Sequence, residues 1–147
     1  MAKKVLIIED DPFLSEIYVT KFEESGFEVF LAGDGFAGLQ KAKDEKPDVL
    51  ILDIVMPNID GLGVLRLMKA EQETKDIPVI ILSNLGEQED VERGFELGAR
   101  AYIIKAHYTP SEVVARVKNI LNKYWGMRLG FLYAARVIIS ALFICFI

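Results

Sequence analysis

The sequence is poor in the residues that build disulfide scaffolds and histidine sites. Its 147 residues include a single cysteine, Cys145, and a single histidine, His107. One cysteine cannot form a disulfide within the chain, which excludes a small secreted scaffold held by disulfides. One histidine excludes metal sites with several histidine ligands and disfavours a catalytic triad that depends on histidine. Polar chemistry is therefore left to carboxylate, hydroxyl and amine groups.

Positive charge is also scarce. The chain has 17 Lys and Arg against 22 Asp and Glu, a net charge of −5, which disfavours a nucleic-acid binder because phosphate contacts need clustered cations. All 22 acidic residues lie at or before Glu112, whereas residues 113–147 contain five Lys or Arg and no acid. Acidic residues follow the start at Glu9 and Asp10, too early for a secretory signal peptide. We therefore expect the main body of the protein to be cytoplasmic.

Five short apolar runs, most of them rich in valine and isoleucine, indicate strands. They start about 20–30 residues apart, which is typical of repeated strand–helix–strand units. Four of the five are uninterrupted by polar residues, as expected for parallel strands that are buried on both faces. The runs are Val5–Ile8, Phe27–Leu31, Val49–Leu52, Val79–Leu82 and Ala101–Ile104.

The segments between these runs carry signals for the start and end of helices. Asp11 before Pro12 is typical of an N-cap followed by proline in the first turn, and Thr109–Glu112 is a capping box before an amphipathic helix. Further helices are predicted over Gly35–Lys43, Gly61–Ala70 and Glu87–Leu97. The alternation predicts an α/β fold, a doubly wound parallel sheet with helices on both faces, over residues 1–123.

Polar residues follow four of the five predicted strands. Glu9 and Asp10 come after the first, Asp53 after the third, Ser83 after the fourth and Lys105 after the fifth. Each alone has an ordinary explanation as a loop acid, a turn residue or a surface cation. The carboxyl ends of parallel strands, however, lie along one edge of the sheet, where ligands bind. We therefore expect these side chains to form one site.

The residue types in this predicted site indicate phosphoryl chemistry. Converging carboxylates repel one another, and a divalent cation relieves that repulsion; oxygen ligands alone favour Mg²⁺ or Mn²⁺. A hydroxyl and an ammonium group can then bind the remaining phosphoryl oxygens. The plausible nucleophile of the protein is a carboxylate.

The same residues resemble the receiver domain of response regulators in two-component signalling. The resemblance covers about residues 3–123 and includes Glu9-Asp10, Asp53, Met56-Pro57, Asp60-Gly61 and, further along, Ser83 and Lys105. It implies a flavodoxin-like (βα)5 fold whose five-stranded sheet has the order 2-1-3-4-5. It also implies signalling through a sensor histidine kinase or phosphotransfer protein and a downstream protein target.

The resemblance assigns roles to individual residues. Asp53 would accept a phosphoryl group from a phosphohistidine. Mg²⁺, or Mn²⁺, would be bound by Asp10, Asp53 and the backbone carbonyl of Val55, with Glu9 acting through a water molecule.

Three more residues would respond to the phosphoryl group. Ser83 would bond a phosphoryl oxygen, and Lys105 would pair with the acyl phosphate. Tyr102 matches an aromatic position that turns inward on activation, although a half-buried strand tyrosine would look the same. The chain departs from the family where Ala106 follows Lys105 in place of proline. We expect a trans peptide bond there, because a cis bond before a non-proline residue costs about 2.5–4 kcal/mol.

The predicted function is that of a stand-alone, phosphorylation-controlled receiver and not an enzyme, since its chemistry amounts to slow self-phosphorylation and hydrolysis. Three alternatives stay open. A constitutive pseudo-receiver would dock without phosphorylation. A phosphatase with an aspartyl nucleophile generally needs a second acid where Val55 stands, and in a flavodoxin-like mononucleotide binder Glu9-Asp10-Asp11 would repel the phosphate.

Residues 124–147 lie outside the receiver pattern and form a hydrophobic tail, predicted to be helical. Leu129–Ile147 is almost wholly apolar, interrupted by Arg136 and Ser140, and its 19 residues approach the length that crosses a bilayer. Three interpretations stay open: a membrane anchor, a helix that docks on the receiver or on a second copy to give a homodimer, and a non-native end.

Overall fold

The sheet has the architecture that the apolar runs predict. A computed structural model describes the backbone of residues 2–144 and the side chains of residues 2–128. Five parallel strands form one sheet in the order β2-β1-β3-β4-β5, which confirms the flavodoxin-like order. The strands are β1 (Lys4–Ile8), β2 (Glu28–Ala32), β3 (Val49–Leu52), β4 (Val79–Ser83) and β5 (Ala101–Ile104). β2 is shifted by one residue from its predicted position, and β1 and β4 are each one residue longer than predicted, at Lys4 and at Ser83.

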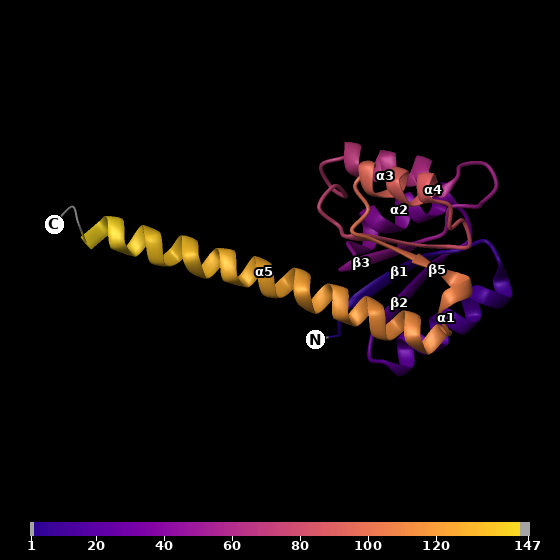
Figure 1. Ribbon diagram of the computed structural model, residues 1–147, viewed down its shortest axis with the longest axis horizontal. Coiled ribbons are helices and arrows are strands. Elements are labelled where there is room, and N and C mark those ends of the chain that lie inside the picture. The colour runs from indigo at the N-terminus through magenta and orange to yellow at the C-terminus, as the bar shows by residue number, and fades with distance from the viewer. Residues whose placement is uncertain (1, 145–147) are drawn as a thin grey trace. The chain divides into compact units, whose positions relative to one another are not determined.

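Helices connect the strands and cover both faces of the sheet. Figure 1 shows α2, α3 and α4 together on one face and α1 on the other, so the sheet is doubly wound as predicted. A short 3₁₀ turn, η1, follows β5. The helical segments are α1 (Pro12–Glu24), α2 (Gly35–Glu45), α3 (Gly61–Ala70), α4 (Gln88–Glu96), η1 (Lys105–His107) and α5 (Pro110–Ile144).

The hydrophobic core explains why most of the runs are continuous. Every residue of β3 and β4 is buried, because both strands have neighbours on either side and helices on either face. On the face covered by α2 and α3, Leu6 and Leu52 pack in one cluster with Leu65 and Met68. The edge strand β2 has one neighbour only, and its Leu31 is 39% exposed.

Three aspartates at the carboxyl edge of the sheet cap the helices that follow. Asp11, Asp34 and Asp60 accept hydrogen bonds from backbone N–H groups in the first turns of α1, α2 and α3, at 2.8–3.1 Å. The predicted role of Asp11 as an N-cap is confirmed. These bonds satisfy donors that have no partner within the helix.

Gly61 allows α3 to begin directly against the end of β3. A Cβ atom at this position would lie 2.1 Å from the carbonyl oxygen of Asp53, far inside contact distance. The Gly61 N–H donates to the Ile54 carbonyl at 2.8 Å. The start of α3 therefore fixes the backbone that carries Asp53.

The last part of the chain forms a compact unit of its own. Contacts divide the chain into residues 1–114 and 115–147. α5 begins in the first unit at Pro110, and the preceding capping-box residue Thr109 accepts from the Glu112 N–H through its Oγ1 at 3.2 Å. The described part of the chain contains no helix with both the length and the apolarity that crossing a membrane requires. The side chains from Leu129 onward, and residues 145–147, lie outside the described residues. The domain boundary at residue 123 therefore stays a prediction, as do the three interpretations of the tail.

Candidate functional site

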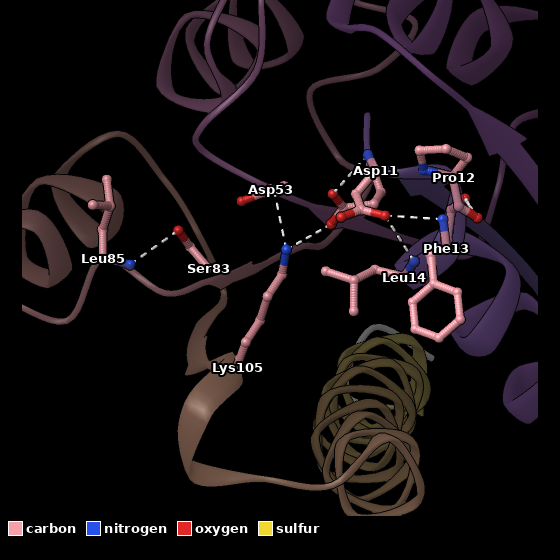
Figure 2. A network of polar contacts seen from close by, with 10 residues as sticks. Asp11, Pro12, Phe13, Leu14, Asp53, Ser83, Leu85 and Lys105 are labelled. Carbon is pink, nitrogen blue, oxygen red and sulfur yellow. Dashed lines mark hydrogen bonds and ion pairs between the residues drawn. The ribbon is translucent and has the colours of Figure 1, made fainter.

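Three strands deliver charged side chains to one point at the carboxyl edge of the sheet. Glu9 follows β1, Asp53 follows β3 and Lys105 follows β5, and Figure 2 shows the Lys105 amine directed toward Asp53. The Lys105 Nζ lies 2.6 Å from Glu9 Oε2 and 3.1 Å from Asp53 Oδ2. Because β4 separates β5 from β3, the long lysine stem is what allows the amine to reach both carboxylates.

Burial makes this ion cluster different from a surface salt bridge. The side chains of Glu9, Asp53 and Lys105 are 5%, 9% and 9% exposed. Burial raises the pKa of Glu9; the hydrogen bond from Lys105 opposes this rise, and the charge of Asp53 adds to it. Burial alone would lower the pKa of Lys105, but the hydrogen bond with Glu9 and the charge of Asp53 raise it instead. The amine is therefore held in its charged form at neutral pH.

Asp10 completes a set of three carboxylates. Glu9, Asp10 and Asp53 each offer an oxygen, and these oxygens all lie within 4.8 Å of one another. Asp10 is exposed, so the set opens to solvent on its side, whereas Glu9 and Asp53 are buried. Oxygen donors in a compact, partly open group fit Mg²⁺ or Mn²⁺, which retain water molecules and bind few protein ligands. The sequence prediction that these three acids meet is confirmed.

Ser83 and Tyr102 are connected through the backbone of a residue that the sequence did not single out. Ser83 is fully buried, and its Oγ accepts a hydrogen bond from the Leu85 N–H at 3.2 Å, as Figure 2 shows. The Tyr102 hydroxyl donates to the Leu85 carbonyl oxygen. Burial raises the pKa of Tyr102. Both groups of Leu85 are backbone atoms, so its side chain gave no signal in the sequence.

The loop after Lys105 adopts the backbone that the sequence predicts. The described residues contain no cis peptide bond, so Lys105 and Ala106 are joined in trans as expected. The chain then forms the η1 turn, in which the Tyr108 N–H donates to the Lys105 carbonyl oxygen at 3.3 Å. Replacement of the usual proline by Ala106 is thus compatible with a Lys105 amine that reaches the acids.

Two predicted roles, the metal ligation by Val55 and the phosphoryl contact of Ser83, are not tested by the described acid cluster. Val55 lies in the loop after β3 with 62% of its surface exposed, and the metal ligation assigned to its carbonyl stays a prediction. The contact of Ser83 with a phosphoryl group likewise stays a prediction; the Ser83 Oγ accepts a hydrogen bond from the Leu85 N–H. Sequence reasoning also did not foresee that Glu9 and Lys105 bind each other directly; spacing brings both to the site but does not pair them.

Known proteins are similar to this chain in sequence and in fold. The family described as the response regulator receiver domain matches residues 5–118. The phosphate regulon transcriptional regulatory protein PhoB of Klebsiella pneumoniae is 37% identical over 123 residues, covering 84% of this chain and 53% of that protein. The chain spans about half the length of the curated relatives it matches.

Solved structures agree with this match. A response regulator from Chloroflexus aurantiacus superimposes with a TM-score of 0.76 at 34% identity, covering 83% of this chain and 99% of that one. The receiver domain of the Francisella response regulator 1452 gives a TM-score of 0.75 at 31% identity, covering 83% of this chain and 98% of that one. In both cases the alignment spans nearly the whole of the other chain.

Proposed function

The chain belongs to the response regulator receiver family of two-component signalling, and from that premise we propose that Asp53 accepts a phosphoryl group from a phosphohistidine of a sensor histidine kinase or phosphotransfer protein. The observation that carries this proposal is the carboxylate of Asp53 at the end of β3, with an ammonium group at 3.1 Å and two more carboxylates beside it. The receiver is a signalling module that accepts a phosphoryl group and not a catalytic enzyme.

The three carboxylates supply a site for a divalent cation. Asp10 and Asp53 would bind Mg²⁺ or Mn²⁺ directly together with the Val55 carbonyl, and Glu9 would act through a water molecule. When bound, the cation supplies positive charge that offsets the repulsion between these acids and an incoming phosphoryl group. The donor set, three carboxylate oxygens within 4.8 Å, supports this assignment.

The transfer itself needs little beyond position and charge. A carboxylate oxygen of Asp53 forms a bond to phosphorus while the bond between phosphorus and the imidazole nitrogen breaks, and the imidazole keeps that electron pair. Lys105 would leave its acid partners to pair with the phosphoryl oxygens, and the Ser83 hydroxyl would donate to another of them. These contacts hold the reacting atoms in line.

The phosphoryl group would then act on the loop that holds Leu85. It brings about −2 charge to a site that is already acidic, a net gain of about −1 because the Asp53 carboxylate loses its own charge when the bond to phosphorus forms. The Ser83 Oγ also accepts from the Leu85 N–H, so a Ser83 hydroxyl that turns toward the phosphoryl group would move Leu85, whose carbonyl oxygen accepts from Tyr102. The change would reach the face formed by α4 and β5 as a shift between two states. We propose that a downstream protein binds this face, in the cytoplasm.

Mass spectrometry after incubation with acetyl phosphate and Mg²⁺ tests the proposal. We expect the wild-type chain to gain one phosphoryl group and Asp53→Asn to gain none. Asp34→Asn is the matched control, because Asn also caps a helix and Asp34 caps α2 away from the acid cluster; it should be labelled like the wild type. Labelling of Asp53→Asn would contradict the proposal, and absence of labelling in the wild type would favour a constitutive pseudo-receiver.

A further inference from the structure

Glu9 is bound by two protein donors within the acid cluster. Its Oε2 accepts from the Lys105 amine at 2.6 Å, and its Oε1 accepts from the Asp11 N–H at 3.2 Å. We propose that binding of a divalent cation to the three carboxylates releases Lys105 from Glu9, so that the amine is free before a phosphoryl group arrives. This inference rests on the cation site of the proposed function and adds an order of events to it.

Lys105 and a divalent cation compete for the same carboxylates. The Lys105 Nζ contacts Asp53 Oδ2 at 3.1 Å as well as Glu9 Oε2. Oxygens of Glu9, Asp10 and Asp53 all lie within 4.8 Å of one another, so a cation held by them would be a near neighbour of the amine. Two positive charges this close repel each other, and the burial of Glu9 and Asp53 leaves little water to screen the repulsion.

Lys105 is the partner that gives way. Its ammonium group carries one charge on a flexible four-carbon stem, whereas the divalent cation carries two and prefers oxygen ligands. A water molecule that connects Glu9 to the cation donates a hydrogen bond to the carboxylate and so replaces the ammonium donor. Because the Asp11 N–H already binds Oε1, this exchange is favoured at Oε2, the oxygen that Lys105 contacts.

The coupling acts in both directions. If the cation weakens the contact of Lys105 with the acids, Lys105 weakens binding of the cation by the same factor, because the two binding free energies are linked. The exposed pair of Lys43 and Glu71, with 2.8 Å between Nζ and Oε2, lies outside the set of three carboxylates and has no such link. This pair therefore supplies the control for both directions.

Acetylation of the full wild-type chain by acetic anhydride, with and without Mg²⁺, tests the release of Lys105. The Lys105 side chain is 9% exposed, so we expect slow acetylation without Mg²⁺ and about tenfold faster acetylation at saturating Mg²⁺, measured by mass spectrometry of peptides. Lys43, whose side chain is 31% exposed, is the internal control and should react at the same rate in both conditions. Acetylation of Lys105 that is unchanged or slower with Mg²⁺ would overturn the inference.

Calorimetric titration with Mg²⁺ tests the reverse effect. Lys105→Met removes the competing charge and should bind Mg²⁺ about tenfold more tightly than the wild type. Lys105→Arg keeps a positive charge and should bind Mg²⁺ nearly as the wild type does, as should the matched control Lys43→Met. Equal affinities of Lys105→Met and the wild type would overturn the inference.

Neither measurement uses a phosphodonor, so both are read separately from phosphoryl labelling of Asp53. Binding of Mg²⁺ without release of Lys105 overturns this inference alone. Release of Lys105 by Mg²⁺ without labelling of Asp53 contradicts the proposed phosphoryl transfer alone. Absence of Mg²⁺ binding in the wild type and in Lys105→Met overturns this inference together with the cation site on which it rests.

Discussion

Acids at the same edge of the sheet are used in two different ways. Asp11, Asp34 and Asp60 accept backbone N–H groups of the helices they precede, and they are exposed or, for Asp34, half-buried. Glu9 and Asp53 are buried and bind the Lys105 amine. Glu9 and Asp11 are only two residues apart, and the Asp11 N–H even donates to Glu9 Oε1 at 3.2 Å. Residue type and sequence neighbourhood therefore do not separate a cap from a site acid.

Burial and the identity of the partner separate them. A cap acid keeps most of its hydration and gains a hydrogen bond from a helix, a contribution that either Asp or Asn can make. A buried acid has lost hydration and depends on a counter-ion, so removal of that counter-ion leaves an uncompensated charge. The comparison predicts that a change at the cluster has a large effect and a change at a cap a small one.

Removal of the shared cation should have the largest effect. Lys105→Met keeps the length of the side chain but leaves the buried Glu9 and Asp53 without their counter-ion, and we expect it to lower the free energy of unfolding by about 3 kcal/mol. Added Mg²⁺ should restore part of this loss in the variant, since a cation bound by the carboxylates replaces the missing charge. Urea unfolding with and without Mg²⁺ measures both effects.

An exposed ion pair supplies the control for this substitution. Lys43 Nζ lies 2.8 Å from Glu71 Oε2, as close as the pairs of the cluster, but the two side chains are 31% and 42% exposed. Lys43→Met makes the same chemical change and should leave the stability nearly unaltered, because solvent screens the pair. Equal losses in the two variants would show that burial is not what distinguishes the cluster.

The sequence predicts where the site acids lie but not how they are bound. Continuous apolar runs place β3 and nearly all of β4 correctly, because strands buried on both faces are mostly apolar. The residues at the ends of these runs must reach the same edge of the sheet. Spacing does not encode side-chain rotamers, so the direct contact of Lys105 with Glu9 was not predictable. The role of Leu85 was hidden because both of its hydrogen bonds use backbone atoms, which every residue except proline possesses.

The stability difference between the wild type and Lys105→Met should also depend on pH, and this pH effect is expected to be no larger than the loss of stability itself. The pKa of Lys105 is raised above 10.5, so its contribution is fully present below pH 10.5 and is lost as the pH rises through the higher pKa in the folded state. The stability difference between the wild type and Lys105→Met should therefore stay constant from neutral pH to about 10.5 and narrow above it.

At acid pH the stability difference between the wild type and Lys105→Met should narrow for another reason. The pKa of Glu9 is raised above 4.5 by burial, and Lys105→Met removes the hydrogen bond that opposes this rise. An acid with a raised pKa stabilises the fold when protonated and loses that contribution as the pH rises. The variant should thus approach the wild type as the pH falls toward 4.5. A difference that already narrows between pH 7 and 8 would mean that the amine titrates far below the expected range.

The smallest effect is expected at a cap. Asp60 accepts the Gly63 N–H at 2.8 Å, and Asp60→Ala should lower the free energy of unfolding by about 1 kcal/mol because one N–H of α3 loses its partner. Asp60→Asn should lose only a fraction of this, since its amide oxygen can accept the same bond. The measurement is urea unfolding under the conditions used for Lys105→Met.

Phosphoryl labelling tests whether the cap also positions the site. Because Gly61 packs on the Asp53 carbonyl, a cap that also positioned the site would slow phosphoryl labelling in Asp60→Ala but not in Asp60→Asn. Equal labelling of both would restrict Asp60 to the stability of α3, and a loss as large as that of Lys105→Met would remove the distinction between the two kinds of acid.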